Sequence, residues 1–519
     1  MEPIFIHAGA GAGGSADRIG SKAVNLARLA RIGLRVPAAF VLDTDLTIQV
    51  QRNGGRLPDR ARSDVRTAVA RLERLTGRQF GGYPPLLVSV RSSPPVSMPG
   101  MLDTILNVGL TESTTRGLLR ATGNPPFVWD TARRFACLFS ETVAGAPTIS
   151  AEGCSDGRDP LTLRDLARDA MRRARAVPTL PFPDDPYAQL EAAVEAVFRS
   201  WSGTRARDYR RLMDIHDDTG TAVIVQAMVF GNGRCPSGSG VGFTRNPSTG
   251  VDELFIDFAF NAQGEDVVAG RHRVDDSARL MTTLPAIARE LADAKSVLER
   301  EFRDMQDFEF TVEAGVLHFL QTRSGKRTPW AALQIAVDLV RSHLIDPYEA
   351  LRHLESYELE DLSRSRLQVN ATSEPIAAAV PAGIGTATGA IALDCDRALE
   401  LAKTRSVILV RRDLATTDLP GLAVADGVLT AHGGRTSHAA VVARQLGKVC
   451  LAGCSALLVD ETRRRCSLGS HTFVEGDIIT LDADSGRVYA GAIPTVIERP
   501  EEALEIVRQW RAAATPVSL

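Results

Sequence analysis

A stretch rich in Ser, Pro, Ala and Gly, residues 366–385, divides this chain of 519 residues into two unequal parts. A composition of this kind is typical of a linker between domains. Before it, apolar residues recur at helical and at strand-like spacings, and residues 112–215 are expected to be largely helical. After it, short strands and helices are expected to alternate closely. The sequence therefore predicts a multidomain protein of the α/β and α+β classes.

The composition sets limits on the kind of protein. The chain is 44% hydrophobic and 24% charged, with a formal net charge of -3, which leaves no field to hold nucleic acid or an anionic membrane. The N-terminus lacks the pattern of a signal peptide, and no apolar run is long enough to span a membrane. Seven scattered cysteines are typical of reduced thiols. We therefore expect a cytoplasmic protein with no nucleic-acid or membrane partner.

The sharpest local signal is the run Gly433–Arg444, which begins with two glycines and contains His438. Glycines permit a close backbone approach. Thr436 or Ser437 suits the N-cap position, and strong helix formers follow His438. His438 is therefore expected in the first turn of a helix, where backbone N–H groups and the helix dipole favour an anion. A neutral imidazole there can act as a nucleophile towards a phosphoryl group.

Two apolar strands, at residues 308–312 and 316–320, are predicted to form a hairpin. Alternation places two carboxylates on one face of the first strand, and an amide and a guanidinium on one face of the second. Carboxylate and amide oxygens suit Mg²⁺. A guanidinium suits bidentate contact with phosphate. The residues concerned are Asp307, Glu309, Gln321 and Arg323.

A third signal lies where a predicted buried strand, residues 86–91, runs into a loop of Ser, Pro and Gly residues. Backbone N–H groups of such a loop, residues 92–104, can close over phosphates and exclude water. Arg91 stands at the start of the loop. The Gly9-x-Gly11-x-x-Gly14 pattern, in contrast, lacks the later acidic residue of a dinucleotide site and is attributed to chance.

Each local signal has a structural alternative that the residues alone leave open. His438 can be a helix-start residue with one structural hydrogen bond, and His432 competes with it on chemistry but lacks the helix placement. The polar face of the hairpin can be an ordinary solvated edge. Arg91 can pair with a surface carboxylate.

Several separate blocks of the sequence, in the same order, resemble the ATP-binding and phosphohistidine parts of the pyruvate, phosphate dikinase family. The resemblance covers roughly residues 18–495. The blocks are Leu87–Ser92 with Val96–Thr104, Val225–Asn232, Gly242–Gly250, Asn261–Gly270, Met305–Phe310 with Gln321–Arg323, and Gly433–Arg444. Because the blocks keep the family's order, chance is negligible as an explanation of the match.

The resemblance implies an organisation in four segments. Residues 1–330 are expected to form an ATP-grasp-like ATP-binding domain, which includes the helical region 112–215. Residues 331–372 are expected to be a helical linker. A swivelling phosphohistidine domain is expected at residues 373–495, followed by a C-terminal helix and tail at residues 496–519. In the family, the swivelling domain docks on the ATP site, takes a phosphoryl or pyrophosphoryl group on its histidine and swings away.

The resemblance also implies an ATP site of charged and polar side chains. Contacts with the nucleotide are expected at Lys22, Arg91, Gly100, Met101, Thr104, Gln226, Met228, Glu265, Asp307, Glu309, Gln321 and Arg323. Within this set, Glu309 and Gln321 are implied as the ligands of Mg²⁺. The implied catalytic residues are His438, Arg91 and Arg323.

Two departures from the family pattern stand out. The usual Gly-Gly-Lys-Gly is Gly20-Ser21-Lys22-Ala23 here, so the segment around Lys22 is expected to be stiffer. The residue before Thr436 is Arg435, which adds a positive charge near His438.

The implied function is that of an ATP-dependent dikinase half-enzyme, because the family's C-terminal barrel for pyruvate or phosphoenolpyruvate is not found before Leu519. The β-phosphoryl group of ATP would pass to His438 with release of AMP, and then to an acceptor on a separate barrel protein. Inorganic phosphate or water would take the γ-phosphoryl group. The alternatives are a small-molecule dikinase of the antibiotic-modifying type and a non-catalytic nucleotide-sensing module. A homodimer is left open.

Overall fold

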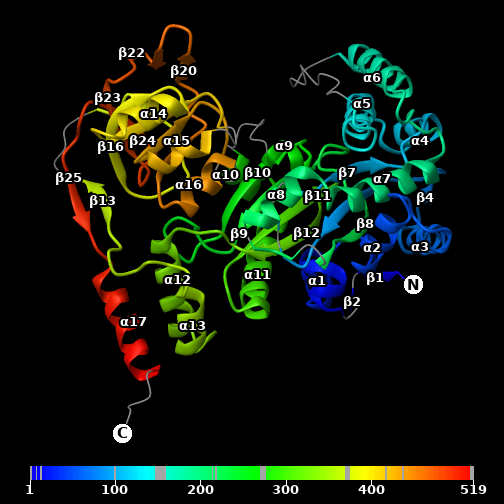
Figure 1. Cartoon of the computed structure of the whole chain (residues 1–519), viewed down its shortest axis with the longest axis horizontal. Helices are drawn as coiled ribbons and strands as arrows, with labels where there is room; N and C mark the ends of the chain where they lie inside the picture. Colours follow the sequence, from blue (N-terminus) through cyan, green and yellow to red (C-terminus); the bar gives the residue numbers. More distant parts are fainter. Residues whose placement is uncertain are drawn as a thin grey trace. The chain divides into compact units, whose positions relative to one another are not determined.

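The computed structural model of the chain describes most of its residues, and these divide into two compact units (Figure 1). Unit 1 comprises Met1–Gly238 and Phe310–Arg323, and unit 2 comprises Ser239–Glu309 and Ser324–Leu519. The domain bounds expected from the sequence stay predictions. The described residues are 3–7, 9–11, 14–96, 98, 101–146, 159–212, 214–216, 219–268, 276–368, 374–414, 418–434 and 438–514.

Unit 1 is built on a six-stranded sheet with the strand order β2-β1-β3-β8-β6-β7, in which the neighbouring strands pair antiparallel. Every residue of the central strand β8 is buried, as expected for a strand covered on both faces. The strands are β1 Ile4–His7, β2 Ala10–Gly11, β3 Ala39–Leu42, β6 Val88–Ser93, β7 Thr104–Val108 and β8 Ala222–Ala227.

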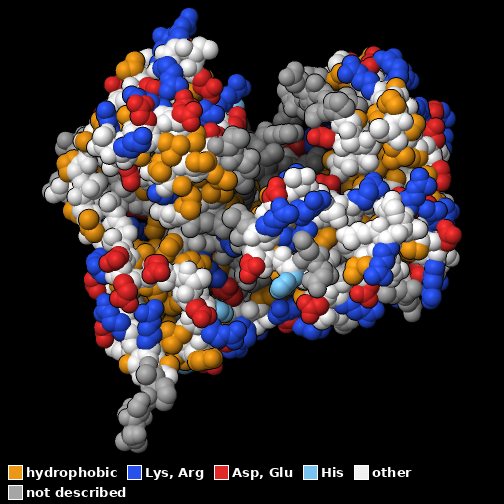
Figure 2. All heavy atoms as spheres, viewed as in Figure 1, with side chains coloured by type: hydrophobic (Ala, Val, Ile, Leu, Met, Phe, Trp, Pro, Cys, Tyr) orange, Lys and Arg blue, Asp and Glu red, His pale blue; other side chains and the backbone are white. Residues whose placement is uncertain are grey.

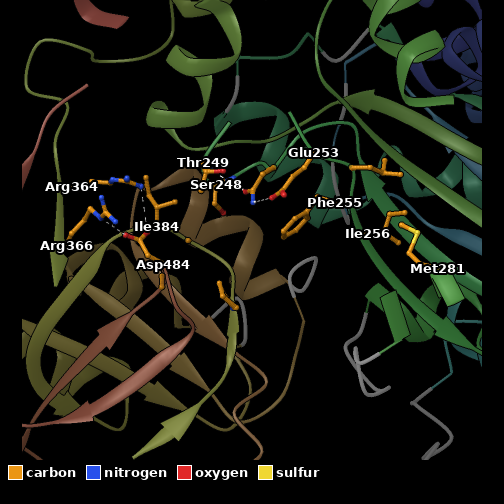
Figure 3. Close-up of a pocket in the computed structure, with 15 residues that line it drawn as sticks. Ser248, Thr249, Glu253, Phe255, Ile256, Met281, Arg364, Arg366, Ile384 and Asp484 are labelled. Atoms are coloured by element: carbon orange, nitrogen blue, oxygen red, sulfur yellow. Dashed lines mark hydrogen bonds and ion pairs between the residues drawn. The ribbon is translucent and has the colours of Figure 1, made fainter. Parts of the chain in front are cut away.

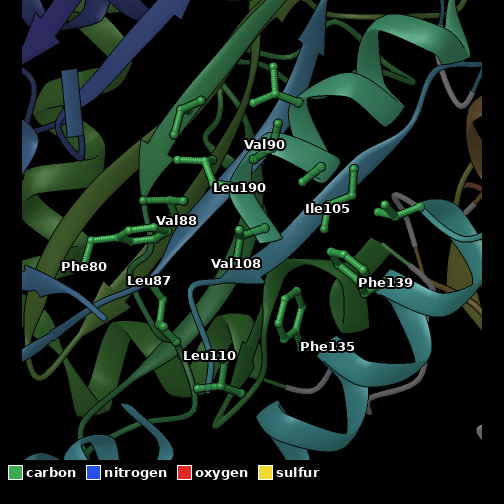
Figure 4. Close-up of a cluster of buried hydrophobic side chains, with 14 of the residues drawn as sticks. Phe80, Leu87, Val88, Val90, Ile105, Val108, Leu110, Phe135, Phe139 and Leu190 are labelled. Atoms are coloured by element: carbon green, nitrogen blue, oxygen red, sulfur yellow. The ribbon is translucent and has the colours of Figure 1, made fainter. Parts of the chain in front are cut away.

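Helices cover this sheet and confirm the expected helical character of residues 112–215. Phe135 and Phe139 of α5 and Leu190 of α7 pack on apolar side chains of β6 and β7, and all three are fully buried (Figure 4). The helices of unit 1 are α1 Ala16–Arg31, α2 Asp45–Arg52, α3 Asp59–Thr76, α4 Glu112–Thr122, α5 Pro125–Thr142, α6 Pro160–Arg175, α7 Pro186–Ser200 and α8 Thr204–Leu212, and a small pair of strands is β4 Gln79–Phe80 with β5 Pro85–Leu86.

A four-stranded sheet has the order β10-β9-β11-β12, and the bounds of the two units pass through β11 and β12. The predicted hairpin is present as β11 and β12. The strands are β9 Gly238–Phe243, β10 Phe255–Phe260, β11 Gln306–Glu313 and β12 Val316–Ser324. The helices of unit 2 before and after this hairpin are α9 Gly264–Val268, α10 Asp276–Thr283, α11 Pro285–Phe302, α12 Pro329–Arg341 and α13 Pro347–Leu354.

The rest of unit 2 contains an eight-stranded sheet with the order β14-β24-β23-β16-β17-β18-β19-β15. Strands β16 to β19 are parallel, and α14, α15 and α16 connect them in succession. The strands are β14 Ala377–Ala378, β15 Val380–Pro381, β16 Thr386–Ala392, β17 Val407–Arg411, β18 Gly427–Thr430, β19 Val449–Ala452, β23 Ile478–Asp482 and β24 Arg487–Ala490. The helices are α14 Cys395–Leu401, α15 Leu419–Val424 and α16 His438–Gln445.

Two smaller sheets and a terminal helix complete unit 2. The strand that enters the eight-stranded region, β13, pairs antiparallel with the strand that leaves it, β25, so that the two connections form one ribbon. The bounds are β13 Arg364–Leu367 and β25 Thr495–Glu498, a three-stranded sheet of β20 Leu457–Asp460, β21 Arg465–Leu468 and β22 His471–Val474, and α17 Glu501–Ala514.

One sequence expectation needs correction, and two further features were not expected from the sequence. The segment expected to be a linker, residues 366–385, contains part of β13 and the short strands β14 and β15, because its backbone pairs with β25, β24 and β19. The glycine-rich run 238–243 has no strand signal, yet it forms β9. The ring of Phe308 covers Gly242, where an added Cβ would lie 2.3 Å from the Cζ atom of Phe308. Helices α2 and α3 were also not expected from the sequence.

The surface has no dominant sign of charge on the face that Figure 2 shows, where basic and acidic side chains are interspersed. This agrees with the small net charge of -3. No helix within the described part of the chain is long and apolar enough to cross a membrane.

Unit 2 contains a buried ion pair whose removal tests the packing of its core. The guanidinium of Arg245 donates to both carboxylate oxygens of Glu299, at 3.0 and 3.1 Å, and the side chains are 5% and 8% exposed. We expect Glu299→Gln to lower the free energy of unfolding by about 3 kcal/mol, because it leaves Arg245 buried with weaker partners. Urea titration measures this. The control is Glu502→Gln, because the side chain of Glu502 is 83% exposed and pairs with Arg341. This control should change the free energy of unfolding by less than about 1 kcal/mol. Equal changes in the two variants would contradict the prediction.

Candidate functional site

Lys22 lies beside a kink in α1 that only glycine can form. Gly20 has a φ of 76°, and a Cβ at this position would lie 1.7 Å from the carbonyl oxygen of Ser93. This close approach lets the N–H of Ser21 donate to the carbonyl of Pro94 at 3.0 Å and the N–H of Ala23 donate to Ser93 Oγ at 3.1 Å. Lys22 is therefore held between two residues that are anchored to the end of β6.

Arg91 stands on the same strand, two residues before Ser93. It pairs with Thr104 of β7 on one side and with Ile224 of β8 on the other. Its Nε atom is buried without a hydrogen-bond partner, and within the described ranges its guanidinium forms no ion pair. A half-buried guanidinium without a counter-charge is unfavourable in isolation, so the position suits an anionic ligand.

Strand β12 lies against α1. The side-chain amide of Asn25 donates to the carbonyl of Thr322 at 3.0 Å. Lys22 precedes Asn25 by three residues, which places both on one side of the helix. Thr322 stands between Gln321 and Arg323 in the chain. Unit 1 thus carries predicted site residues on α1 and on strands near it. Lys22 is on α1, Arg91 and Thr104 are on β6 and β7, and Gln321 and Arg323 are on β12.

Two further predicted residues lie on β11, in unit 2. Phe308 and Phe310 are 0% and 1% exposed and pack in the core, and alternation turns Asp307 and Glu309 to the other side of the strand. This is the arrangement that the sequence predicted for β11. Asp307 is buried, and Glu309 is half-buried.

Glu309 and Gln321, the implied ligands of Mg²⁺, belong to different units, and their role as ligands stays a prediction that their chemistry fits. Neither Glu309 nor Gln321 has a side-chain hydrogen bond or ion pair with any described residue, so the oxygens of both are available as ligands. A carboxylate and an amide oxygen suit Mg²⁺, which keeps several of its waters. The described residues contain no group of three or more His, Cys, Asp or Glu side chains that would suit a transition metal.

Three other predicted contacts have structural partners. The side chain of Gln226 is 3% exposed, and its amide donates to the carbonyl of Pro37 at 3.2 Å. The backbone N–H of Met228 donates to the carbonyl of Leu87 at 2.9 Å. The carbonyl of Met101 accepts from Arg205 Nε at 3.2 Å. Their roles at a nucleotide stay predictions.

The backbone of His438 lies where the sequence predicts it, in the first turn of a helix, because His438 is the first residue of α16. Its side chain and that of Glu265 are outside the described part, and so are Gly100, Thr436 and the added charge of Arg435. The rival His432 has its Nδ1 atom 3.2 Å from each carboxylate oxygen of Asp413, in an exposed pair.

A cavity of about 420 Å³ in unit 1 was not expected from the sequence. It lies next to the segment after β8, where Arg78 Nη1 donates to the carbonyl of Met228 at 3.4 Å. Phe127, Phe230 and His318 are among the residues that line it. Burial, followed by the nearby charges of Arg35 and Arg78, lowers the pKa of His318 to about 4.

A cavity of about 650 Å³ in unit 2 (Figure 3) differs from the surroundings of Arg91. Its two arginines already have carboxylate partners. Arg364 and Arg366 lie 3.7 and 3.5 Å from Asp484 and 2.8 and 3.4 Å from Glu498. Because these guanidinium groups are neutralised within the chain, Arg91 is the better candidate to contact phosphate.

The shifted pKa of His318 predicts a pH dependence of stability. Between pH 6.5, the ordinary pKa of histidine, and about 4, the unfolded chain binds more protons at this position than the folded chain does. Stability is therefore lost as the pH falls through this window. We expect His318→Gln to lose less stability than the wild type between pH 7 and pH 5.5 in urea titrations. The exposed His471→Gln should behave as the wild type; parallel losses in all three proteins would refute the prediction.

Comparison with known proteins matches two parts of the chain to domain families. Residues 47–289 match the family model "Pyruvate phosphate dikinase, AMP/ATP-binding domain", and residues 403–486 match "PEP-utilising enzyme, mobile domain". The first match includes β6, β7 and β8, and the second includes α16.

Curated relatives with the name pyruvate, phosphate dikinase align with almost the whole chain. The protein of Clostridium symbiosum is 41% identical over 509 residues, which are 95% of this chain and 58% of the relative. Those of Entamoeba histolytica and Rhizobium meliloti are 39% and 40% identical, over 95% and 96% of this chain and 57% and 58% of the relatives. The chain therefore spans less than two thirds of the length of these relatives. By its two matched domains and these relatives, the chain is similar to pyruvate, phosphate dikinases over an AMP/ATP-binding domain and a mobile domain.

Proposed function

We propose that this chain is an ATP-dependent phosphotransferase in which an ATP-grasp-like domain binds ATP and passes its β-phosphoryl group to His438. The observation that carries the proposal is the guanidinium of Arg91, which has no counter-charge among the described residues and lies on the strand whose end anchors the neighbours of Lys22. Two cations held on rigid elements form a binding site for the phosphates of a nucleotide. The similarity to pyruvate, phosphate dikinases supports ATP as the nucleotide.

The residues divide into roles by their chemistry. Lys22, Arg91 and Arg323 neutralise charge on the phosphates, which is the main catalytic demand of phosphoryl transfer. Glu309 and Gln321 would hold Mg²⁺, which supplies further charge neutralisation when bound. The segment proposed to cover the phosphates contains Gly100, Met101 and Thr104. The residues proposed to lie beside the adenine of the nucleotide are Gln226 and Met228. Glu265 and Asp307 are placed close to the nucleotide without a more specific role.

The proposed reaction starts with a neutral imidazole. A nitrogen of His438 attacks the β-phosphorus, the bond between this phosphorus and the oxygen that bridges to the α-phosphate breaks, and AMP leaves. The γ-phosphoryl group passes to inorganic phosphate or to water. The β-phosphoryl group stays on His438 at the start of α16, where free N–H groups of a helix N-terminus favour an anion. The acceptor is proposed to be bound by a separate protein.

The direct test of the histidine is labelling with ATP that carries the label at the β-phosphate. The wild type with Mg²⁺ should take up an acid-labile, base-stable label, and His438→Ala should take up none, because the nucleophile is lost. The matched variant His432→Ala should label like the wild type, since His432 is paired with Asp413 at a strand end. Label that persists in His438→Ala and disappears in His432→Ala would assign the nucleophile to His432 instead.

The phosphate contact is tested by binding of a non-hydrolysable ATP analogue, measured by calorimetry. We expect Arg91→Gln to weaken binding by about tenfold or more, because a charge-assisted hydrogen bond is lost. Arg91→Lys should bind with intermediate affinity, since it keeps the charge without the planar fork. Arg364→Gln, in the larger cavity, is the control and should leave the affinity unchanged. Unchanged affinity in Arg91→Gln would remove Arg91 from the site.

A further inference from the structure

A completely buried arginine lies on the helix that begins with His438. Arg444 is in α16 and is 0% exposed, and it is one of the largest fully buried side chains among the described residues. Its Nη1 atom donates to the carbonyl of Ala382 at 3.4 Å. Its guanidinium carbon lies 5.5 Å from the centre of the Phe243 ring. Burial lowers the pKa of Arg444, and the neighbouring Cys450, Asp307 and Asp257 act against this shift.

The neighbours of Arg444 come from two different sheets of unit 2. Ala382 and Cys450 belong to the eight-stranded region, in which the mobile-domain match lies. Phe243 belongs to β9 of the four-stranded sheet, where its ring packs edge-on against Phe255 at 6.2 Å. Arg444 therefore extends from the helix of one sheet to the strands of the other.

The two carboxylates are located where they can balance this charge. Asp257 of β10 is 1% exposed and Asp307 of β11 is 4% exposed, and each acts electrostatically on Arg444. A buried cluster of this kind gains little net free energy, because the cost of removing the charges from water offsets their attraction. Such a cluster can instead fix the orientation of one element on another. These are the properties needed for a domain that docks in one arrangement and leaves again.

We propose that Arg444 is a positioning residue that seats the helix bearing His438 on the strands bearing Asp257 and Asp307. The inference that α16 docks on these strands is drawn from the contacts of Arg444. The inference that this docking affects phosphoryl transfer rests on the proposed function. Arg444 touches no reacting atom in this account; it acts through the placement of α16.

A purely structural role is the alternative. In that case Arg444 stabilises the eight-stranded region through Ala382, and its removal has the same effect whether or not Asp257 carries a charge. The positioning role predicts coupling instead. Without Arg444, the buried carboxylate of Asp257 loses a neighbouring positive charge in the docked arrangement, so that neutralising it should cause no further loss.

The experiment compares Arg444→Gln, Asp257→Asn and the double variant with the wild type in the full chain. The control is Arg463→Gln, whose side chain is 70% exposed and pairs with Asp460. Three quantities are measured: hydrogen exchange of α16 and β9 by mass spectrometry, the affinity for a non-hydrolysable ATP analogue, and the rate of β-phosphate labelling. Thermal unfolding of each protein shows whether it is folded.

We expect Arg444→Gln to exchange faster in both α16 and β9, to bind the analogue as the wild type does, and to label about 30-fold more slowly. Asp257→Asn should slow labelling in the wild-type background and not slow it further in Arg444→Gln. The control should match the wild type in every measurement. Wild-type exchange in β9 of a folded Arg444→Gln, or equal effects of Asp257→Asn in both backgrounds, would overturn the proposal.

The exchange experiment separates this inference from the proposed function. If the wild type takes up no label, the proposed function fails, and the exchange of β9 still decides whether Arg444 holds the two sheets together. If the wild type is labelled and β9 exchanges alike in all variants, the proposed function stands and the positioning role fails. Should Arg444→Gln not fold, Arg444→Lys is used, for which the same coupling with Asp257→Asn is measured.

Discussion

The candidate site depends on one close approach of two backbone segments, at Gly20 and Ser93. A side chain at position 20 would collide with the carbonyl of Ser93, since its Cβ would lie 1.7 Å from that oxygen. The approach allows the hydrogen bonds that tie α1 to the end of β6. Asn25, further along the same helix, holds β12 through the carbonyl of Thr322. One glycine thus lets α1 meet β6, Asn25 of the same helix holds β12, and each of these three elements bears predicted phosphate ligands.

The balance of charge then separates structural from functional arginines. Arg245 is buried against Glu299, and Arg327 donates to both carboxylate oxygens of Asp304, at 2.7 and 2.5 Å. Arg364 pairs with the carboxylates of Asp484 and Glu498. Arg91 has a buried Nε atom and no partner in the part of the chain that the structure describes. Because Arg245, Arg327 and Arg364 are balanced by carboxylates within the chain, Arg91 stands out as a cation that a phosphate ligand can balance.

Much of the fold could be predicted from periodicity and turn residues. The β11–β12 hairpin, α11 and the start of α16 follow from local patterns. β9 could not be predicted, because its glycines gain a covering side chain only when Phe308 packs across them. For the site, periodicity predicted the strand that carries Asp307 and Glu309, and their role stays a prediction, whereas the proximity of Lys22 to β6 depends on long-range contacts. Arg444 was missed because an arginine in a short helix is usually exposed, and only the tertiary structure reveals its burial.

The central claim is that the bond between the α- and β-phosphates of ATP is broken, which distinguishes this reaction from that of an ordinary kinase. The most direct measurement is the nucleotide formed in a single turnover, when excess chain is mixed with ATP and Mg²⁺, quenched and separated. We expect AMP, in an amount equal to the phosphate carried by the protein, and no AMP from His438→Ala. Formation of ADP with phosphorylated protein would contradict the central claim, because the transferred group would then be the γ-phosphoryl group.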